Sequence, residues 1–255
     1  MGRDTLDRAI RSALNQTYPP AEIIVVAGKP AVISTDYPSI VRVVEKSSSD
    51  GSKWTAAHNR NTGVKLATSE LVAFLDDDDF WYSDKMRKQV MCFENNLSLV
   101  LLSCVDYTLK GKVKFFRPIK CLPTEKSVLE AHYGRKRFIP SLYYTPTPSV
   151  VLSRTSALQT PMNEELLGFE DTWWLYELQK HGHKIIQIKE ALLQVTANPI
   201  RSISRDTKEK NVSWAKKIST VDERFGLNYL RGICLRNSLL SLRFRDALFY
   251  LRATP

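Results

Sequence analysis

The sequence lacks the long apolar run that a membrane-spanning helix needs. No stretch approaches the roughly 20 apolar residues that cross a bilayer, so we expect no transmembrane helix. The first residues, Met1 to Asp4, carry no apolar signal core, so we expect a cytoplasmic protein without an export signal. Hydrophobic residues make up 43% and charged residues 25% of the 255 residues, which is typical of a globular protein.

Cysteine and histidine are also scarce, with four of each. The cysteines are scattered without a CxxC pair, which argues against a disulfide framework and against a cysteine zinc site. The histidines, at positions 58, 132, 181 and 183, show no spacing typical of metal ligands. We expect reduced cysteines, and we expect His181 and His183 to lie at the end of a helix.

The net charge of +10 is unevenly distributed. From Arg201 to the end there are 12 Lys/Arg and 5 Asp/Glu, a net charge of +7. A basic region of this kind indicates an anionic partner: a membrane surface, a phosphorylated lipid or a nucleic acid. The alternative is a solvated basic face.

Short apolar segments alternate with helical patterns along the first 197 residues. Helices are expected at 4–17, 54–67, 84–96 and 170–181, and strands at 22–26, 40–44, 71–75, 99–103, 149–153 and 184–188. This order favours an α/β fold with a mostly parallel sheet flanked by helices. Between them, 106–148 contains a hairpin signal at 110–112 and a loop at 140–148. Two further helices are expected at 208–224 and 227–252, with no strand beyond Ala197.

Four consecutive aspartates, Asp76 to Asp79, follow the predicted strand 71–75. Adjacent carboxylates repel each other, and more strongly where water is excluded, so a cation best explains the cluster. Oxygen ligands suit a hard divalent ion such as Mg or Mn, and ligands of open α/β sheets bind beyond the carboxyl ends of strands. On an extended segment Asp76 and Asp78 would share one face. The alternative is a solvated acidic turn.

Four motifs, in order, resemble the family 2 glycosyltransferases of the GT-A fold. The segment Arg60-Asn61-Thr62-Gly63, followed by the aspartate run, is similar to the family's Arg-Asn-x-Gly helix and LDxDD stretch. The other matching segments are 12–19, which ends in Gln-Thr-Tyr-Pro, the strand 149–154, and Gly168 to Trp174 with its Glu-Asp pair. The resemblance covers about residues 3 to 195.

The resemblance implies a GT-A, Rossmann-like domain over residues 1–197. Its nucleotide-sugar half would span about 1–105 and its acceptor half about 106–197, with 198–255 as a basic helical C-terminal region. It also implies an inverting, metal-dependent enzyme of bacterial surface-polysaccharide synthesis. The donor would be a nucleotide sugar, with UDP preferred, the cation Mn or Mg, and the acceptor a glycan or a lipid-linked glycan.

On the donor side, the resemblance makes Asp78 the metal ligand. Asp76 and Asp77 would hold the nucleotide, while Arg60 would approach the diphosphate with Asn61 beside it. Arg60 has the guanidinium fork that suits phosphate oxygens, and its alternative is a surface helix arginine. No chemical role falls to Asp79, which is either solvated or structures the turn. Arg201 matches a loose pattern for a diphosphate contact.

The resemblance also places Glu170 at the nucleotide sugar. On the acceptor side, it makes Asp171 the general base. A carboxylate there can accept a proton from the attacking hydroxyl. The alternative is an ordinary helix N-terminal charge favoured by the helix dipole. Trp81, Trp173 and Trp174 would either stack on a sugar or pack in the core.

Two departures from the family pattern weaken the predicted nucleotide site. Family members begin with an apolar strand that ends in an Asn-Arg-like stretch, and here the chain starts at about its last residue, Arg3. The acidic residue expected after strand 22–26 is also absent, because the sequence reads Ala27-Gly28-Lys29. The alternative function is therefore a catalytically impaired GT-A-like module that binds a glycan or a partner.

The C-terminal region mixes apolar residues with arginines between Tyr229 and Arg252. This pattern is typical of an interfacial helix pair on anionic lipid. The alternative is a helical appendage that packs on the catalytic domain. The membrane interpretation would place the protein peripherally on the inner face of the cytoplasmic membrane. Nucleic acid is disfavoured because the positive charge lies away from the carboxylate edge.

Overall fold

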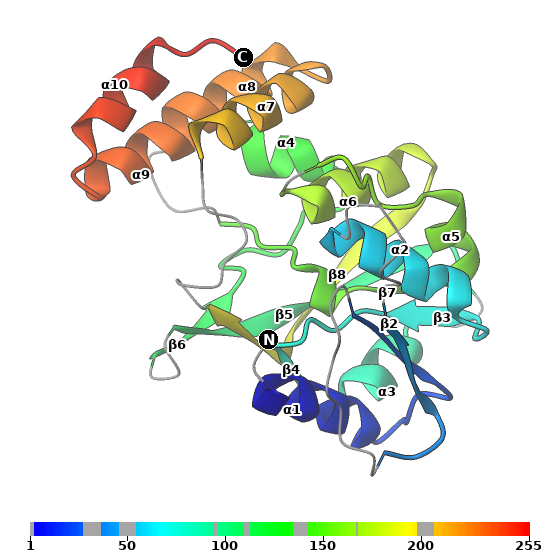
Figure 1. Cartoon of the computed structure of the whole chain (residues 1–255). Coiled ribbons are helices and arrows are strands. Elements are labelled where there is room, and N and C mark those ends of the chain that lie inside the picture. The colour runs from blue at the N-terminus through cyan, green and yellow to red at the C-terminus, as the bar shows by residue number, and fades with distance from the viewer. Residues whose placement is uncertain are drawn as a thin grey trace.

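The computed structural model describes residues 3–27, 37–45, 55–93, 96–109, 113–134, 142–166, 168–197 and 207–255. It shows a β-sheet with helices on both faces and a helical unit formed by the C-terminal region (Figure 1). The predicted α/β class is therefore confirmed. The predicted turn at 110–112 and Arg201 lie outside the described residues.

Most elements fall where apolar periodicity predicted them. The helices before residue 198 are α1 (Arg3–Leu14), α2 (Ala56–Leu66), α3 (Lys85–Val90), α4 (Val128–Tyr133), α5 (Arg154–Gln159) and α6 (Glu170–Lys180), with the short 3-10 helix η1 (Thr147–Ser149). The strands are β1 (Ile23–Ala27), β2 (Val41–Glu45), β3 (Leu71–Ala73), β4 (Phe80–Trp81), β5 (Leu99–Leu109), β6 (Val113–Arg117), β7 (Val151–Ser153) and β8 (Lys184–Ala197). Gly182 follows α6 with φ of 86°, the left-handed conformation expected there.

The main sheet is mixed, whereas the sequence favoured mostly parallel strands. Its order is β3-β7-β5-β8-β4, and β6 pairs with β5. Within it β5 and β8 are parallel, and the other pairings are antiparallel. The prediction of parallel strands failed because it assumed that every helical connection returns the chain in the same direction.

The strands β1 and β2 form a separate parallel pair. Among the described residues neither strand is hydrogen-bonded to the main sheet. The two sheets are nevertheless linked at one end, because Glu22 accepts hydrogen bonds from the backbone N–H groups of Thr68 and Ser69, at 2.6 and 3.1 Å. Glu22 immediately precedes β1, and Thr68 and Ser69 lie just before β3, so these bonds hold the chain segments that lead into the two strands together. The expected absence of a first strand stays a prediction.

The central strand β5 divides the core into two layers. Val100 and Leu102 contact the helices α2, α5 and α6 on one face, whereas Leu99 and Leu101 face α1 and α3 on the other. This alternation follows the two-residue period of a strand. Burying a leucine contributes about 1.5–3 kcal/mol, so this strand supplies much of the driving force that holds both helical layers.

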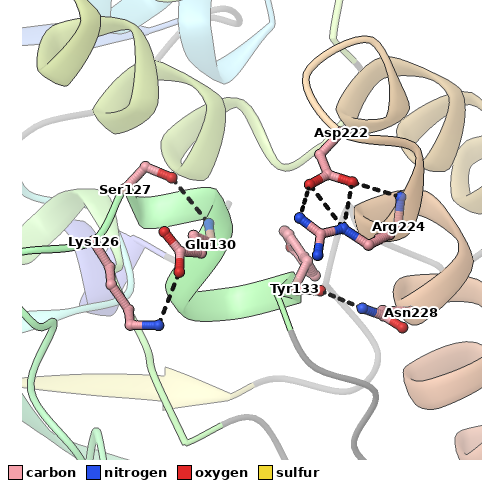
Figure 2. Close-up of polar contacts among 7 residues, drawn as sticks. All are labelled: Lys126, Ser127, Glu130, Tyr133, Asp222, Arg224 and Asn228. Carbon is pink, nitrogen blue, oxygen red and sulfur yellow. Dashed lines mark hydrogen bonds and ion pairs between the residues drawn. The ribbon is translucent and has the colours of Figure 1, made fainter.

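The C-terminal helices pack on α4 and α6, which confirms the appendage interpretation for their inner faces. They are α7 (Lys208–Ser219), α8 (Glu223–Asn228), the π-helical segment η2 (Tyr229–Cys234), α9 (Leu235–Leu240) and α10 (Phe244–Arg252). Trp214 of α7 stacks on Phe169, just before α6, with ring centroids 4.9 Å apart and planes at 11°. Figure 2 shows the polar side of the junction, where Asn228 donates to the Tyr133 carbonyl at 2.8 Å.

The single helix predicted over 227–252 is broken between α9 and α10. Leu242 adopts φ of 53° there, which reverses the chain. Local sequence signals do not mark this break, because Ser241, Leu242 and Arg243 include neither glycine nor proline. No helix in the described part of the chain is long and apolar enough to cross a membrane.

Replacing Trp214 should loosen this unit. Trp214 is 2% exposed, so Trp214→Ala is expected to lower the free energy of unfolding in urea by about 3–5 kcal/mol. The exposed Val221 is the control, and Val221→Ala should change it by less than about 0.5 kcal/mol. Equal effects of the two substitutions would contradict the packing described for α7.

Candidate active site

The aspartate run lies in the connection between β3 and β4. The strand ends at Ala73, and the backbone N–H of Asp79 donates to the Asp76 carbonyl at 3.1 Å, which closes a turn. The expectation that Asp76 and Asp78 share one face assumed an extended segment and does not apply to this turn. Arg8 of α1 donates to the Asp78 carbonyl at 2.8 Å, which fixes the turn from one side.

Asp79 fixes the same turn from the other side. Its side chain is buried, and its Oδ1 accepts a hydrogen bond from the Thr196 N–H of β8 at 3.0 Å. Burial, together with the negative charges of Asp76 and Asp78, raises the pKa of Asp79 to about 8. Of the two possibilities left open by the sequence, Asp79 structures the turn and is not solvated.

Arg60 connects the aspartate run to the start of α6. From α2, its Nη2 donates to Asp76 Oδ1 at 2.8 Å and its Nη1 donates to Glu170 Oε1 at 3.1 Å. The Arg60 side chain is only 14% exposed, so the alternative of a surface arginine is wrong. Because one guanidinium pairs with both carboxylates, the predicted donor and acceptor motifs meet in one site.

Asn61 is buried and holds the loop that leads towards α6. Its Nδ2 donates to the Met162 carbonyl at 2.9 Å and to Glu164 Oε1 at 2.8 Å, and its Oδ1 accepts from the Met162 N–H at 2.9 Å. His58 lies 2.7 Å from Glu164 Oε2. Both N–H groups of the Asn61 amide are thus engaged within the protein, and a contact between Asn61 and a nucleotide stays a prediction.

The carboxylates Glu170 and Asp171 begin α6, as expected. Gly168 and Phe169 precede them with φ of 133° and 62°, and this turn sets the direction of the helix start. Asp171 Oδ1 accepts from the Thr172 N–H at 2.7 Å. Burial, with the negative charge of Glu170, raises the pKa of Asp171 to about 6, although Arg60 and the Thr172 N–H act in the opposite direction.

The three tryptophans considered as sugar platforms are all buried. Trp81, Trp173 and Trp174 are 5%, 8% and 2% exposed and belong to the core clusters. The structure therefore favours packing as their role.

Tyr144 lies within electrostatic range of the same carboxylates, although the sequence placed it only in a loop. Its ring is edge-to-face with Tyr107, at a centroid distance of 6.0 Å. Burial raises the pKa of Tyr144, and the charges of Asp79, Tyr107, Asp171 and Asp76 raise it further. No local motif marks this residue, because only the fold brings its loop to the aspartates.

The aspartate run supplies carboxylate oxygens, which are the ligand type that hard divalent ions take. No group of three His, Cys, Asp or Glu side chains within the described ranges could by itself hold a metal. Mg²⁺ and similar ions commonly use one or two carboxylates together with substrate phosphate oxygens. Asp78 lies in the same turn as Asp76, which pairs with Arg60.

The charge environment of Asp171 can be measured directly. Its carboxyl carbon should titrate by NMR at pH about 6, and the neutral form should dominate below that pH. Glu170→Gln removes a negative neighbour and should lower the pKa of Asp171, whereas Arg60→Met removes a positive one and should raise it. An Asp171 that titrates near pH 4 in the unmodified protein would contradict this geometry.

The family match and the named relatives agree, because all are glycosyltransferases. Residues 2–154 match the family described as Glycosyl transferase family 2. The chain is 26% identical over 191 residues to the amylovoran biosynthesis glycosyltransferase AmsB of Erwinia amylovora, covering 69% of this chain and 60% of AmsB. It is 35% identical over 103 residues to WfgD of Escherichia coli, named a UDP-Glc:alpha-D-GlcNAc-diphosphoundecaprenol beta-1,3-glucosyltransferase, covering 38% of this chain and 39% of WfgD.

Solved structures agree on the fold. The crystal structure of S. aureus TarS 1-349 in complex with UDP-GlcNAc aligns with a TM-score of 0.57 and 18% identity, covering 97% of this chain and 77% of that one. The matched segments span 60% and 39% of the length of AmsB and WfgD. The chain belongs to glycosyl transferase family 2 and has the GT-A fold that its motifs predicted.

Proposed function

We propose that this chain transfers a sugar from a nucleotide sugar, with UDP preferred, to a glycan or lipid-linked glycan, with inversion at the anomeric carbon. The observation that carries the proposal is the pairing of Arg60 with both Asp76 and Glu170. It brings the aspartate run, which would serve the donor, to the start of α6, where Asp171 follows Glu170 directly and would serve the acceptor. A displacement reaction needs both reactants held together in this way.

On the donor side, Asp78 would hold Mg or Mn, while Asp76 and Asp77 hold the nucleotide. The cation would neutralise charge on the departing diphosphate. Arg60 lies beside these carboxylates, and its guanidinium can donate to phosphate oxygens as the leaving group becomes more negative. Its two carboxylate partners keep the side chain in place before the donor binds.

On the acceptor side, Asp171 would accept the proton of the attacking hydroxyl. The new bond forms between the acceptor oxygen and the anomeric carbon, while the bond from that carbon to the diphosphate oxygen breaks. A single displacement inverts the configuration. The raised pKa of Asp171, about 6, makes it a better base than an ordinary aspartate while leaving it ionised at neutral pH.

The lipid-linked acceptor is supported by the relatives. WfgD and WfaP of Escherichia coli are both named as glucosyltransferases acting on a diphosphoundecaprenol-linked GlcNAc, and they are 35% and 31% identical to this chain over about a hundred residues. An acceptor with a polyprenyl anchor lies in the membrane. We therefore propose that the protein works peripherally on the inner face of the cytoplasmic membrane.

A second candidate is an impaired GT-A-like module that binds a glycan or partner. The separation of β1 and β2 from the main sheet favours it, as does the absence of an acidic residue directly after β1. Calorimetric titration with UDP and Mn separates the two functions. Metal-dependent UDP binding supports the enzyme, and its absence supports the impaired module.

The roles of the two key aspartates predict different defects. With a donor that is turned over, Asp171→Asn should lower the rate of nucleotide release by about 100-fold to 10,000-fold while UDP still binds. Asp78→Ala should instead abolish the Mn dependence of UDP binding. Asp84→Asn is the control, since Asp84 contacts Thr17 and Arg87 outside the site. Full transfer by both variants would refute the proposed mechanism.

A further inference from the structure

The outer surface of α9 and α10 is strongly apolar. Six large hydrophobic side chains between residues 239 and 251 are each at least 43% exposed, and Leu242 reaches 75%. We call this set the α9–α10 apolar patch: Leu239, Leu240, Leu242, Phe244, Leu248 and Leu251. Exposed apolar patches of this kind on globular domains mark protein or membrane interaction sites.

The apolar patch is not needed by the core of the helical unit. In the same helix α10, Ala247 and Tyr250 are packed inward and are each 4% exposed. The Tyr250 hydroxyl accepts a hydrogen bond from Asn211 of α7 at 2.8 Å, which joins α10 to α7. The apolar side chains of α10 are therefore only partly used by the fold, because Phe244, Leu248 and Leu251 stay exposed.

The turn between the two helices presents its leucine under strain. Leu242 has φ of 53°, a conformation that is unfavourable for a bulky side chain and natural for glycine. The turn is nevertheless fixed, because the Leu242 N–H donates to the Leu239 carbonyl at 3.0 Å and the Arg243 N–H donates to the Ser238 carbonyl at 2.8 Å. Because the Leu242 side chain is 75% exposed, it has little packing within the protein that would offset the strain.

Positive charge surrounds the patch. Arg243, Arg245 and Arg252 are exposed beside its leucines. The acidic residue of the same segment, Asp246, pairs with Lys208 of α7 at 2.7 Å and lies 3.7 Å from Arg243. Because one aspartate is shared between a lysine and an arginine, the surface combines apolar side chains with an excess of positive charge.

We propose that the α9–α10 apolar patch docks the protein on an anionic lipid surface. Leucine and phenylalanine side chains would enter the acyl boundary while the arginines contact lipid phosphates, a combination that gives two binding signals. A second copy of this chain fits less well as the occupant, because a symmetric contact of this patch would place arginines against arginines.

The helical unit that carries the patch contacts the segment just before α6, where the candidate active site begins. Trp214 of α7 stacks on Phe169, which directly precedes Glu170 and Asp171. Docking on lipid would thus hold the start of α6 at a defined position above the membrane. This use rests on the proposed function with a lipid-linked acceptor, but lipid binding itself can be tested without it.

The test is co-sedimentation of the full chain with vesicles. We expect binding to phosphatidylcholine vesicles that contain about 30% phosphatidylglycerol, weak binding to pure phosphatidylcholine, and release by high salt. Leu242→Gly combined with Leu248→Ser should weaken binding by at least about tenfold. Leu242→Gly alone should weaken binding without lowering thermal stability, because glycine relieves the strained turn.

Matched variants separate the two signals. Arg245→Gln with Arg252→Gln should reduce binding to the anionic vesicles and leave binding to pure phosphatidylcholine unchanged. Leu158→Ser, at an exposed leucine of α5, is the control and should bind like the unmodified chain.

Three results would overturn the proposal: no binding of the unmodified chain to anionic vesicles, unchanged binding of the double leucine variant, or a dimer in light scattering that Leu248→Ser dissociates while vesicle binding is absent. UDP and Mn titration without vesicles reports on the proposed function separately. Loss of that binding, with vesicle binding intact, would refute the transferase activity and leave the docking surface in place.

Discussion

The double ion pair of Arg60 is the constraint on which the rest of the site depends. A guanidinium that is only 14% exposed needs partners, and here it has two carboxylates that are 94 residues apart in the sequence, Asp76 and Glu170. Their mutual repulsion is relieved by the charge between them. The same contact joins α2, the turn after β3 and the start of α6, so the donor and acceptor sides cannot separate without exposing or unpairing a charge.

The surrounding structure supports this contact from three directions. Asp79 ties the aspartate turn to β8, Arg8 ties it to α1, and Asn61 holds the loop before α6. On the far side, Trp214 packs against Phe169 and couples the helical unit to the same helix start. The proposed membrane docking and the proposed catalysis would therefore share one path through Phe169. The basic C-terminal region would then position the start of α6 relative to the membrane.

The elements with strong local sequence signals were predicted, and those set by pairing with distant residues were not. The Glu-Asp helix start, Gly182 and the apolar run 99–103 are local signals, and each was predicted. The strand β8 runs to Ala197, far past the predicted end at 188, because its second half gains its stability by pairing with β4 and β5. Tyr144 and the structural role of Asp79 depend on the same long-range contacts. Local sequence patterns likewise do not show whether two strands pair in parallel or antiparallel.

The central claim is that Arg60 holds the two halves of the site together, and a double-mutant cycle measures it directly. The free energy of unfolding would be determined for the unmodified chain, Arg60→Met, Glu170→Gln and the double variant. We expect a coupling energy of about 1 kcal/mol or more, because each substitution removes the partner of the other residue. Additive effects, within about 0.3–0.5 kcal/mol, would show that the two residues do not interact and would contradict it.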